Sequence, residues 1–138
     1  MKVLTVFLFG VFIFILTCTK NVHELILYQQ IYFQWNGQPE FNHFLDFTGY
    51  PFHSPTYLLQ KIGHSMFFFL FSFFLSRLFF SLNAVFVIGV IYGLLTEFAQ
   101  LFFSRTGCLL DVFYDSMGVL SYCTLAFISK VHYFHKDE

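Results

Sequence analysis

Long apolar runs separated by short polar links organise this chain. Three of the runs cover residues 62–80, 84–103 and 109–128. Each is close to the roughly 20 residues that a helix needs to cross the hydrocarbon core of a membrane. Because a backbone in lipid must pair its amides within its own segment, each run is predicted to be helical. The links Ser-Leu-Asn and Ser-Arg-Thr-Gly-Cys are so short that neighbouring helices are expected to be antiparallel.

A fourth apolar run, "VLTVFLFGVFIFILTCT", begins at Val3 directly after Lys2 and is short for a span. It fits either a secretory signal or an uncleaved first helix. A signal should end in a small-residue cleavage site, and "ILTCTK" lacks the Ala-x-Ala pattern. We favour the uncleaved helix. The sequence therefore predicts an all-α integral membrane four-helix bundle with antiparallel spans, short links and one long outer loop.

The long loop is the polar-containing connection over residues 20–61. It is rich in Tyr, Phe and Trp, whose rings suit the headgroup layer of a membrane. Residues 22–34 are predicted to form a short helix on the membrane surface. Turn and breaker residues support a loop elsewhere in this stretch, namely Asn36-Gly37, Pro39, Pro51 and Pro55.

Composition supports a membrane protein without a separate soluble domain. Of 138 residues, 57% are hydrophobic and only 11% are charged, about half the charged share of a soluble domain. A net charge of -1 excludes the basic face that nucleic-acid binding needs. We divide the chain into a first helix with the aromatic-rich loop, 1–60, and a three-helix core with a short cytoplasmic tail, 61–138. A slight excess of Lys and Arg on one side favours both termini in the cytoplasm and the loop outside.

Charged and polar side chains gather where the three core runs meet the outer side. Their spacings of three or four residues place each pair on one helix face. Lys61 and His64 open the first core run, Glu97, Gln100 and Arg105 end the second, and Asp111 and Asp115 begin the third. Small residues at Gly89, Gly93 and Gly118 would let the helices approach closely and bring these side chains together.

Two interpretations of this polar cluster remain open. A charge near the membrane centre costs roughly 2.5 to 3.5 kcal/mol, so the groups should face one another. In the structural interpretation, Glu97 pairs with Arg105 or Lys61 and the cluster only holds the helices together. Such polar contacts stabilise the packing of membrane helices by only about 0.6 kcal/mol each on average. This stabilisation is small compared with the cost of placing so many charges in the membrane. We therefore favour a functional pocket.

The residue types allow two kinds of chemistry in that pocket. Arg105 and Lys61 suit the phosphate or carboxylate of an anionic headgroup, with Gln100 and Asp115 as further ligand contacts. Alternatively, Glu97 and His64 act as acid and base with support from Asp111. The carboxylates could also hold a divalent ion such as Mg²⁺ or Ca²⁺. No nucleophile motif is visible, so whether the chain is an enzyme and which cofactor it uses stay open.

The segments "KIGHSMFFFLFSFFL" and "TEFAQLFFSRTGCLLDVFYDSMGVL" resemble the VanZ-like family. The shared pattern is Lys-x-x-His opening one helix, then Glu-x-x-Gln, a nearby Arg, and an Asp followed four residues later by Asn and then by Gly. The matching residues are Lys61, His64, Glu97, Gln100, Arg105, Asp111 and Gly118. Gln60 stands where the family commonly has Asp, and Asp115 stands where Asn is usual, which adds a negative charge.

The resemblance implies a small integral protein of the bacterial cytoplasmic membrane. The family is named for a member that lowers susceptibility to teicoplanin, and the resemblance brings no settled reaction. Teicoplanin acts on lipid-linked cell-wall precursors at the outer face, so our leading hypothesis is binding of an anionic envelope lipid or such a precursor. The alternatives are a membrane hydrolase or transferase acting on a lipid-linked phosphate, and a purely structural role. The oligomeric state stays open.

Overall fold

The computed structural model describes residues 1–20, 22–46, 48, 50–103 and 105–134. Over these residues the chain is helical and contains no β-strand. Its elements are α1 (Lys2–Cys18), α2 (Val22–Tyr28), the 3₁₀ helix η1 (Phe41–Leu45), α3 (Pro55–Leu75), α4 (Leu82–Phe102) and α5 (Leu109–Phe134). The predicted all-α bundle with short links between the last three helices is confirmed.

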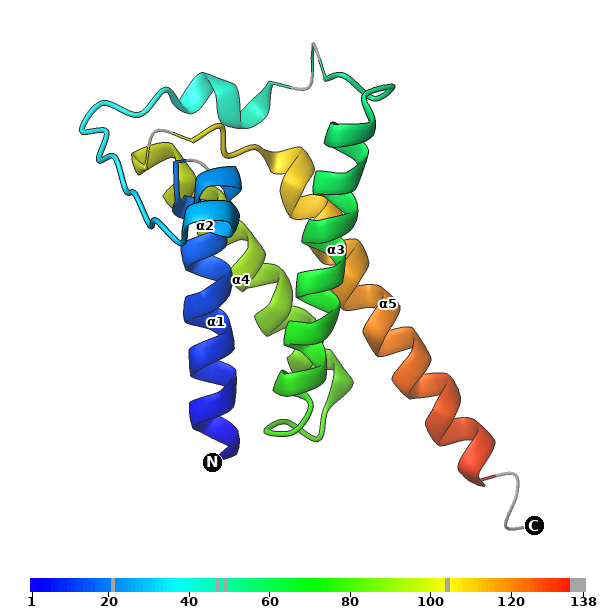
Figure 1. Cartoon of the computed structure of the whole chain (residues 1–138). Helices are drawn as coiled ribbons and strands as arrows, with labels where there is room; N and C mark the ends of the chain where they lie inside the picture. The colour runs from blue at the N-terminus through cyan, green and yellow to red at the C-terminus, as the bar shows by residue number, and fades with distance from the viewer. Residues whose placement is uncertain (21, 47, 49, 104, 135–138) are drawn as a thin grey trace.

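Three helices, α3, α4 and α5, are long and apolar enough to cross a membrane, whereas α1 is apolar but shorter. Figure 1 shows α3, α4 and α5 running alternately up and down, with α1 beside them. The amino terminus and the end of α5 lie at one end of the bundle, and the long connection with α2 and η1 covers the other. The last residues of the expected tail, 135–138, lie outside the described residues.

The boundaries of the spans differ from the prediction at three places. Helix α3 begins at Pro55 and ends at Leu75, whereas a run over 62–80 was predicted. Pro55 occupies the first turn after the N-cap Ser54, where its missing N–H costs nothing and its fixed φ suits a helix. Interpreting Pro55 as a loop breaker was therefore wrong, and Lys61 lies inside α3 instead of at its start. Helix α5 continues to Phe134, beyond the predicted end near residue 128.

The expected surface helix over 22–34 is also shorter, because α2 ends at Tyr28 and Gln29 adopts a left-handed φ of 55°. The chain then returns toward the bundle as an extended segment. The backbone N–H of Asn36 donates to the carbonyl of Phe102 at 2.8 Å, and the Trp35 ring stacks on Phe102 with centroids 5.7 Å apart. The loop is thereby fastened over the end of α4.

Close helix contacts form around small residues, as predicted. A Cβ at Gly89 would lie 2.9 Å from a methyl carbon of Val119, and a Cβ at Gly118 would overlap the backbone carbonyl of Ser65. These glycines bring α4 against α5 and α5 against α3. The apolar core lies beside these contacts and consists of Ile13, Phe68, Phe71, Leu75, Val85 and Val119.

Candidate functional site

A buried ion pair joins α3 to α5 at the end of the bundle that the loop covers. Lys61 Nζ lies 2.5 Å from Asp111 Oδ1, and the two side chains are only 7% and 6% exposed. The Lys61 amine also lies 4.7 Å from the centre of the Tyr57 ring, one turn earlier on α3. The positive charge of Lys61 is thus compensated by a carboxylate and an aromatic face.

One turn deeper, three ionisable side chains from three helices converge. His64 Nδ1 of α3 lies 3.0 Å from Asp115 Oδ1 of α5 and 3.8 Å from Glu97 Oε1 of α4. The side chains of Glu97 and Asp115 are fully buried, at 0% exposure. We call His64, Glu97 and Asp115 the inner triad.

Two hydrogen bonds hold the Glu97 carboxylate in place. Gln100 Nε2 donates to Oε1 at 2.5 Å, and the backbone N–H of Cys108 donates to Oε2 at 3.2 Å. The second bond requires the α4–α5 connection to pass close to α4. Gly107 allows this approach, because a Cβ there would overlap the backbone carbonyl of Glu97.

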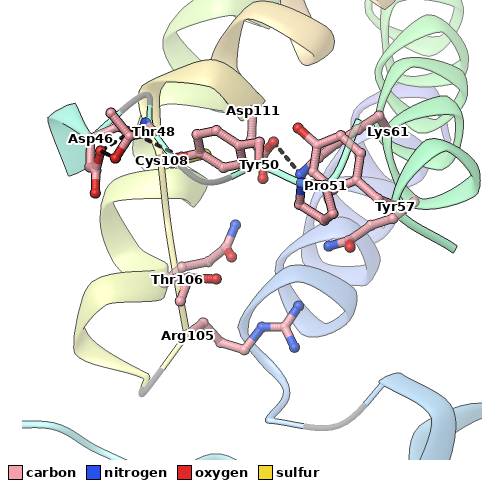
Figure 2. Close-up of a pocket in the computed structure, with 12 residues that line it drawn as sticks. Asp46, Thr48, Tyr50, Pro51, Tyr57, Lys61, Arg105, Thr106, Cys108 and Asp111 are labelled. Atoms are coloured by element: carbon pink, nitrogen blue, oxygen red, sulfur yellow. Dashed lines mark hydrogen bonds and ion pairs between the residues drawn. The ribbon is translucent and has the colours of Figure 1, made fainter. Parts of the chain in front are cut away.

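Above the inner triad lies a cavity of about 310 Å³, which we call the outer cavity. It opens under the long loop, and Figure 2 shows Arg105 on one side of it and the Lys61–Asp111 pair on another. Its walls come from the loop, α3, α4 and the start of α5. The lining residues are Asp46, Thr48, Tyr50, Pro51, Tyr57, Gln60, Lys61, Gln100, Arg105, Thr106, Cys108 and Asp111.

Arg105 stands apart from the other predicted site residues. It follows the end of α4 in the connection, is partly exposed, and its Nη1 donates to the backbone carbonyl of Lys20 at 3.1 Å. Within the described part of the chain, no ion pair includes Arg105. The pairing of Glu97 with Arg105 or Lys61, expected in the structural interpretation, is wrong. Arg105 faces the outer cavity because it lies in the connection after the end of α4. Lys61 forms its ion pair with Asp111 instead of with Glu97.

Sequence reasoning missed several residues that line the outer cavity. The Tyr57 hydroxyl is buried and has no hydrogen-bond partner within normal distance among the described residues. A signal for Tyr57 was available, because it lies four residues before Lys61 and so shares its helix face. Asp46 and Tyr50 had no such signal, since their position depends on how the loop folds back. Burial raises the pKa of the Tyr50 hydroxyl and of the Cys108 thiol above their usual ranges.

The site therefore has two levels with different chemistry. The outer cavity is lined by the Arg105 guanidinium, the Lys61–Asp111 pair, tyrosine and threonine hydroxyls and the Asp46 carboxyl group. The inner triad offers one imidazole and two carboxylates. Gln100 connects the levels, because it lines the cavity and donates to Glu97. An anion suits the first level, and a proton or a metal cation suits the second.

A curated relative covers most of the chain. The protein named "Uncharacterized membrane protein YwnJ" of Bacillus subtilis (strain 168) is 31% identical over 121 residues, which is 86% of this chain and 85% of the relative. No protein-family model matches the chain, and no solved structure matches it. The relative's name states a membrane location and no activity. Together with the three long apolar helices, it identifies the chain as a membrane protein.

Proposed function

Because the chain belongs to the family of the Bacillus subtilis membrane protein YwnJ, we propose that it binds an anionic lipid headgroup in its outer cavity. The ligand is a membrane lipid or a lipid-linked cell-wall precursor, and the shared chemistry is a phosphate or pyrophosphate group. In this proposal the protein is a multi-pass component of the bacterial cytoplasmic membrane. Its termini are cytoplasmic and its cavity faces outward.

The observation that carries this proposal is the position of Arg105. Its guanidinium lines a cavity of about 310 Å³ together with Lys61, Asp46 and Asp111, and it forms no ion pair with a described carboxylate. Guanidinium groups bind phosphate in a two-pronged geometry that a point charge does not offer. A cavity near 300 Å³ is at the lower end of the range for small-molecule sites. It therefore suits a headgroup whose acyl or prenyl chain stays in the membrane.

The surroundings of the cavity also suit a headgroup. The Tyr57 hydroxyl is a buried donor without a described partner, so a ligand oxygen would satisfy it. The loop above the cavity carries Trp35, which is 67% exposed. Exposed Trp is typical of the membrane–water interface, where headgroups lie. A lipid would reach the cavity without leaving its own layer.

We further propose that the family is VanZ-like. What supports this assignment is that five of the seven residues matching the VanZ-like motifs contact one another in pairs at one end of the bundle. They are Lys61, His64, Glu97, Gln100 and Asp111. Binding of a lipid-linked precursor at the outer face would connect the site to teicoplanin, which acts on such precursors. Teicoplanin susceptibility of cells with and without the intact gene tests this link, and equal susceptibility would remove it.

Native mass spectrometry of the purified protein tests the binding proposal. We compare the wild type with Arg105→Gln and with Arg77→Gln, an exposed arginine in the α3–α4 link that lies over the Phe73 ring. Wild type and Arg77→Gln should retain an anionic lipid, whereas Arg105→Gln should bind it about 10- to 100-fold more weakly, the value of a charge-assisted hydrogen bond. Equal retention in all three proteins would refute the proposal. Unchanged helical circular dichroism shows that each variant is folded.

A second candidate function is a hydrolase or transferase acting on the bound phosphate. The observation that favours it is the inner triad directly behind Gln100, with Glu97 and His64 in contact as an acid–base pair. Turnover of a lipid-linked phosphate by purified protein, lost in Glu97→Gln, would establish it. Retention of lipid without turnover would leave binding as the activity.

A further inference from the structure

We propose that the inner triad, His64, Glu97 and Asp115, binds a divalent transition-metal ion of the zinc class. This site is separate from the outer cavity, because none of the three residues lines that cavity. The proposal goes beyond headgroup binding and does not depend on it.

The geometry of the triad fits a metal ion. One ligand atom from each residue lies within 4.8 Å of the others, and the distances from His64 Nδ1 are 3.0 Å to Asp115 Oδ1 and 3.8 Å to Glu97 Oε1. Bonds of about 2.0–2.2 Å around a tetrahedral ion place neighbouring ligand atoms about 3.3–3.6 Å apart. The two distances from His64 Nδ1 bracket this range, and the ligand atoms of Glu97 and Asp115, which lie within 4.8 Å of each other, would approach on coordination.

One oxygen of the triad lacks a partner. Asp115 is fully buried, and its Oδ2 atom accepts no hydrogen bond from any described residue. A buried carboxylate oxygen without a donor is costly unless a cation satisfies it. A Cβ at Gly93 would lie 3.3 Å from this oxygen. The glycine therefore keeps side-chain atoms away from the unpartnered atom.

The excess of carboxylates over basic groups in the triad also favours a bound cation. Two carboxylates, Glu97 and Asp115, are buried together with a single imidazole. The nearest buried lysine is Lys61, which is already paired with Asp111. A divalent ion would balance both carboxylates in an environment where unbalanced charge is expensive.

The neighbours of Glu97 resemble the outer shell of a metal site. Ligating carboxylates are usually held by further hydrogen bonds, and Glu97 accepts one from Gln100 and one from the backbone of Cys108. Each carboxylate oxygen has a second lone pair, so these bonds leave capacity for a metal. The orientation of the ligand is fixed before the metal arrives.

The ligand types select the metal class. Imidazole nitrogen favours zinc and its transition-metal neighbours, whereas Mg²⁺ and Ca²⁺ prefer oxygen alone. This choice differs from the Mg²⁺ or Ca²⁺ suggested by the carboxylates in the sequence. Three protein ligands leave the fourth position of a tetrahedral ion for water or a ligand group, as in catalytic zinc sites.

Metal titration of the full chain in detergent tests the proposal. After chelator treatment, wild-type protein should bind one equivalent of Zn²⁺ and show a higher Tm with the metal. Glu97→Gln and Asp115→Asn, which keep side-chain shape, should bind Zn²⁺ at least 100-fold more weakly. The control is Glu40→Gln, the same carboxyl-to-amide change at an exposed loop residue, which should retain the metal. Absence of stoichiometric binding in the wild type, or equal loss in Glu40→Gln, would overturn the proposal.

X-ray absorption at the zinc edge of the wild type gives a test that needs no variant. The expected spectrum shows one imidazole and otherwise oxygen at about 2.0–2.2 Å. A sulfur shell near 2.3 Å would place the metal on cysteine and refute the triad as its site. If Arg105→Gln loses lipid but still binds Zn²⁺, the two sites are independent. If the wild type binds Zn²⁺ but no lipid, and the triad variants lose the Zn²⁺, only the headgroup proposal is refuted.

Discussion

Lys61 of α3 and Asp111 of α5 lie 50 positions apart in the sequence and form a buried ion pair 2.5 Å long. The pair stands between the outer cavity and the inner triad, and it fixes the register of α3 against α5. Because both groups are almost completely buried, removal of either partner leaves the other as an uncompensated charge. Substitution of either residue therefore measures how much the buried ion pair contributes to the stability of the bundle.

We predict that Lys61→Met and Asp111→Leu each lower the free energy of unfolding by about 3–5 kcal/mol, the usual cost of breaking a buried pair. The double variant should lose much less than the sum, because it leaves no unpaired charge. Denaturant unfolding in detergent, analysed as a double-mutant cycle, measures the coupling. Additive losses would mean that the two side chains act independently.

A second prediction concerns the contact between Gly118 and Ser65. Gly118→Ala should lower stability by about 1–3 kcal/mol or more, because the new Cβ would overlap the Ser65 backbone, which cannot rotate away. Gly63→Ala is the matched control, since a Cβ there meets no atom within 4 Å. It should be neutral or stabilise α3 by up to about 1 kcal/mol. Similar unfolding curves for both variants would contradict the close packing of α3 and α5.

The helical bundle and the gathering of the polar residues followed from the sequence for a physical reason. Apolar runs of membrane length can only be helices, and short links force neighbours to be antiparallel. Once the runs alternate, pairs such as Lys61 with His64 and Glu97 with Gln100 must reach the same end of the bundle. The small residues at Gly89 and Gly118 similarly indicated close approach, which the structure confirms.

The sequence did not determine which groups pair. Glu97 contacts His64 and Gln100, whereas Lys61 forms an ion pair with Asp111. These partners could not be predicted because they depend on the rotation of each helix about its axis and on where α3 begins. The start of α3 was misjudged at Pro55, a residue that suits both a loop and a first helical turn. The loop side of the outer cavity was not predictable from periodicity, because Asp46 and Tyr50 lie in a segment without a regular repeat.

A third prediction follows from the position of Cys108 in the wall of the outer cavity. The residue is 4% exposed, and burial raises the pKa of its thiol. The thiolate fraction near pH 7 is therefore below that of a free cysteine, whose pKa is about 8.5. In a Cys18→Ala/Cys123→Ala background, alkylation should be slow at pH 7 and should keep rising above pH 9.

Bound ligand should slow this alkylation further, since Cys108 lines the cavity. The comparison is the same variant with and without added anionic lipid in detergent. A reaction at pH 7 as fast as that of an exposed cysteine would contradict the burial of Cys108. Equal rates with and without lipid would argue against headgroup binding in this cavity.

The orientation of the bundle gives a fourth prediction. In a cysteine-free background, Gly37→Cys places a thiol in the exposed loop and Lys130→Cys places one near the end of α5. A membrane-impermeant thiol reagent should label Gly37→Cys in intact spheroplasts and should label Lys130→Cys only after the membrane is permeabilised. The reverse pattern would turn the outer cavity toward the cytoplasm. Arg105 would then still be available to an anionic headgroup of the inner leaflet, but a ligand presented at the outer face, where teicoplanin acts, could not reach it.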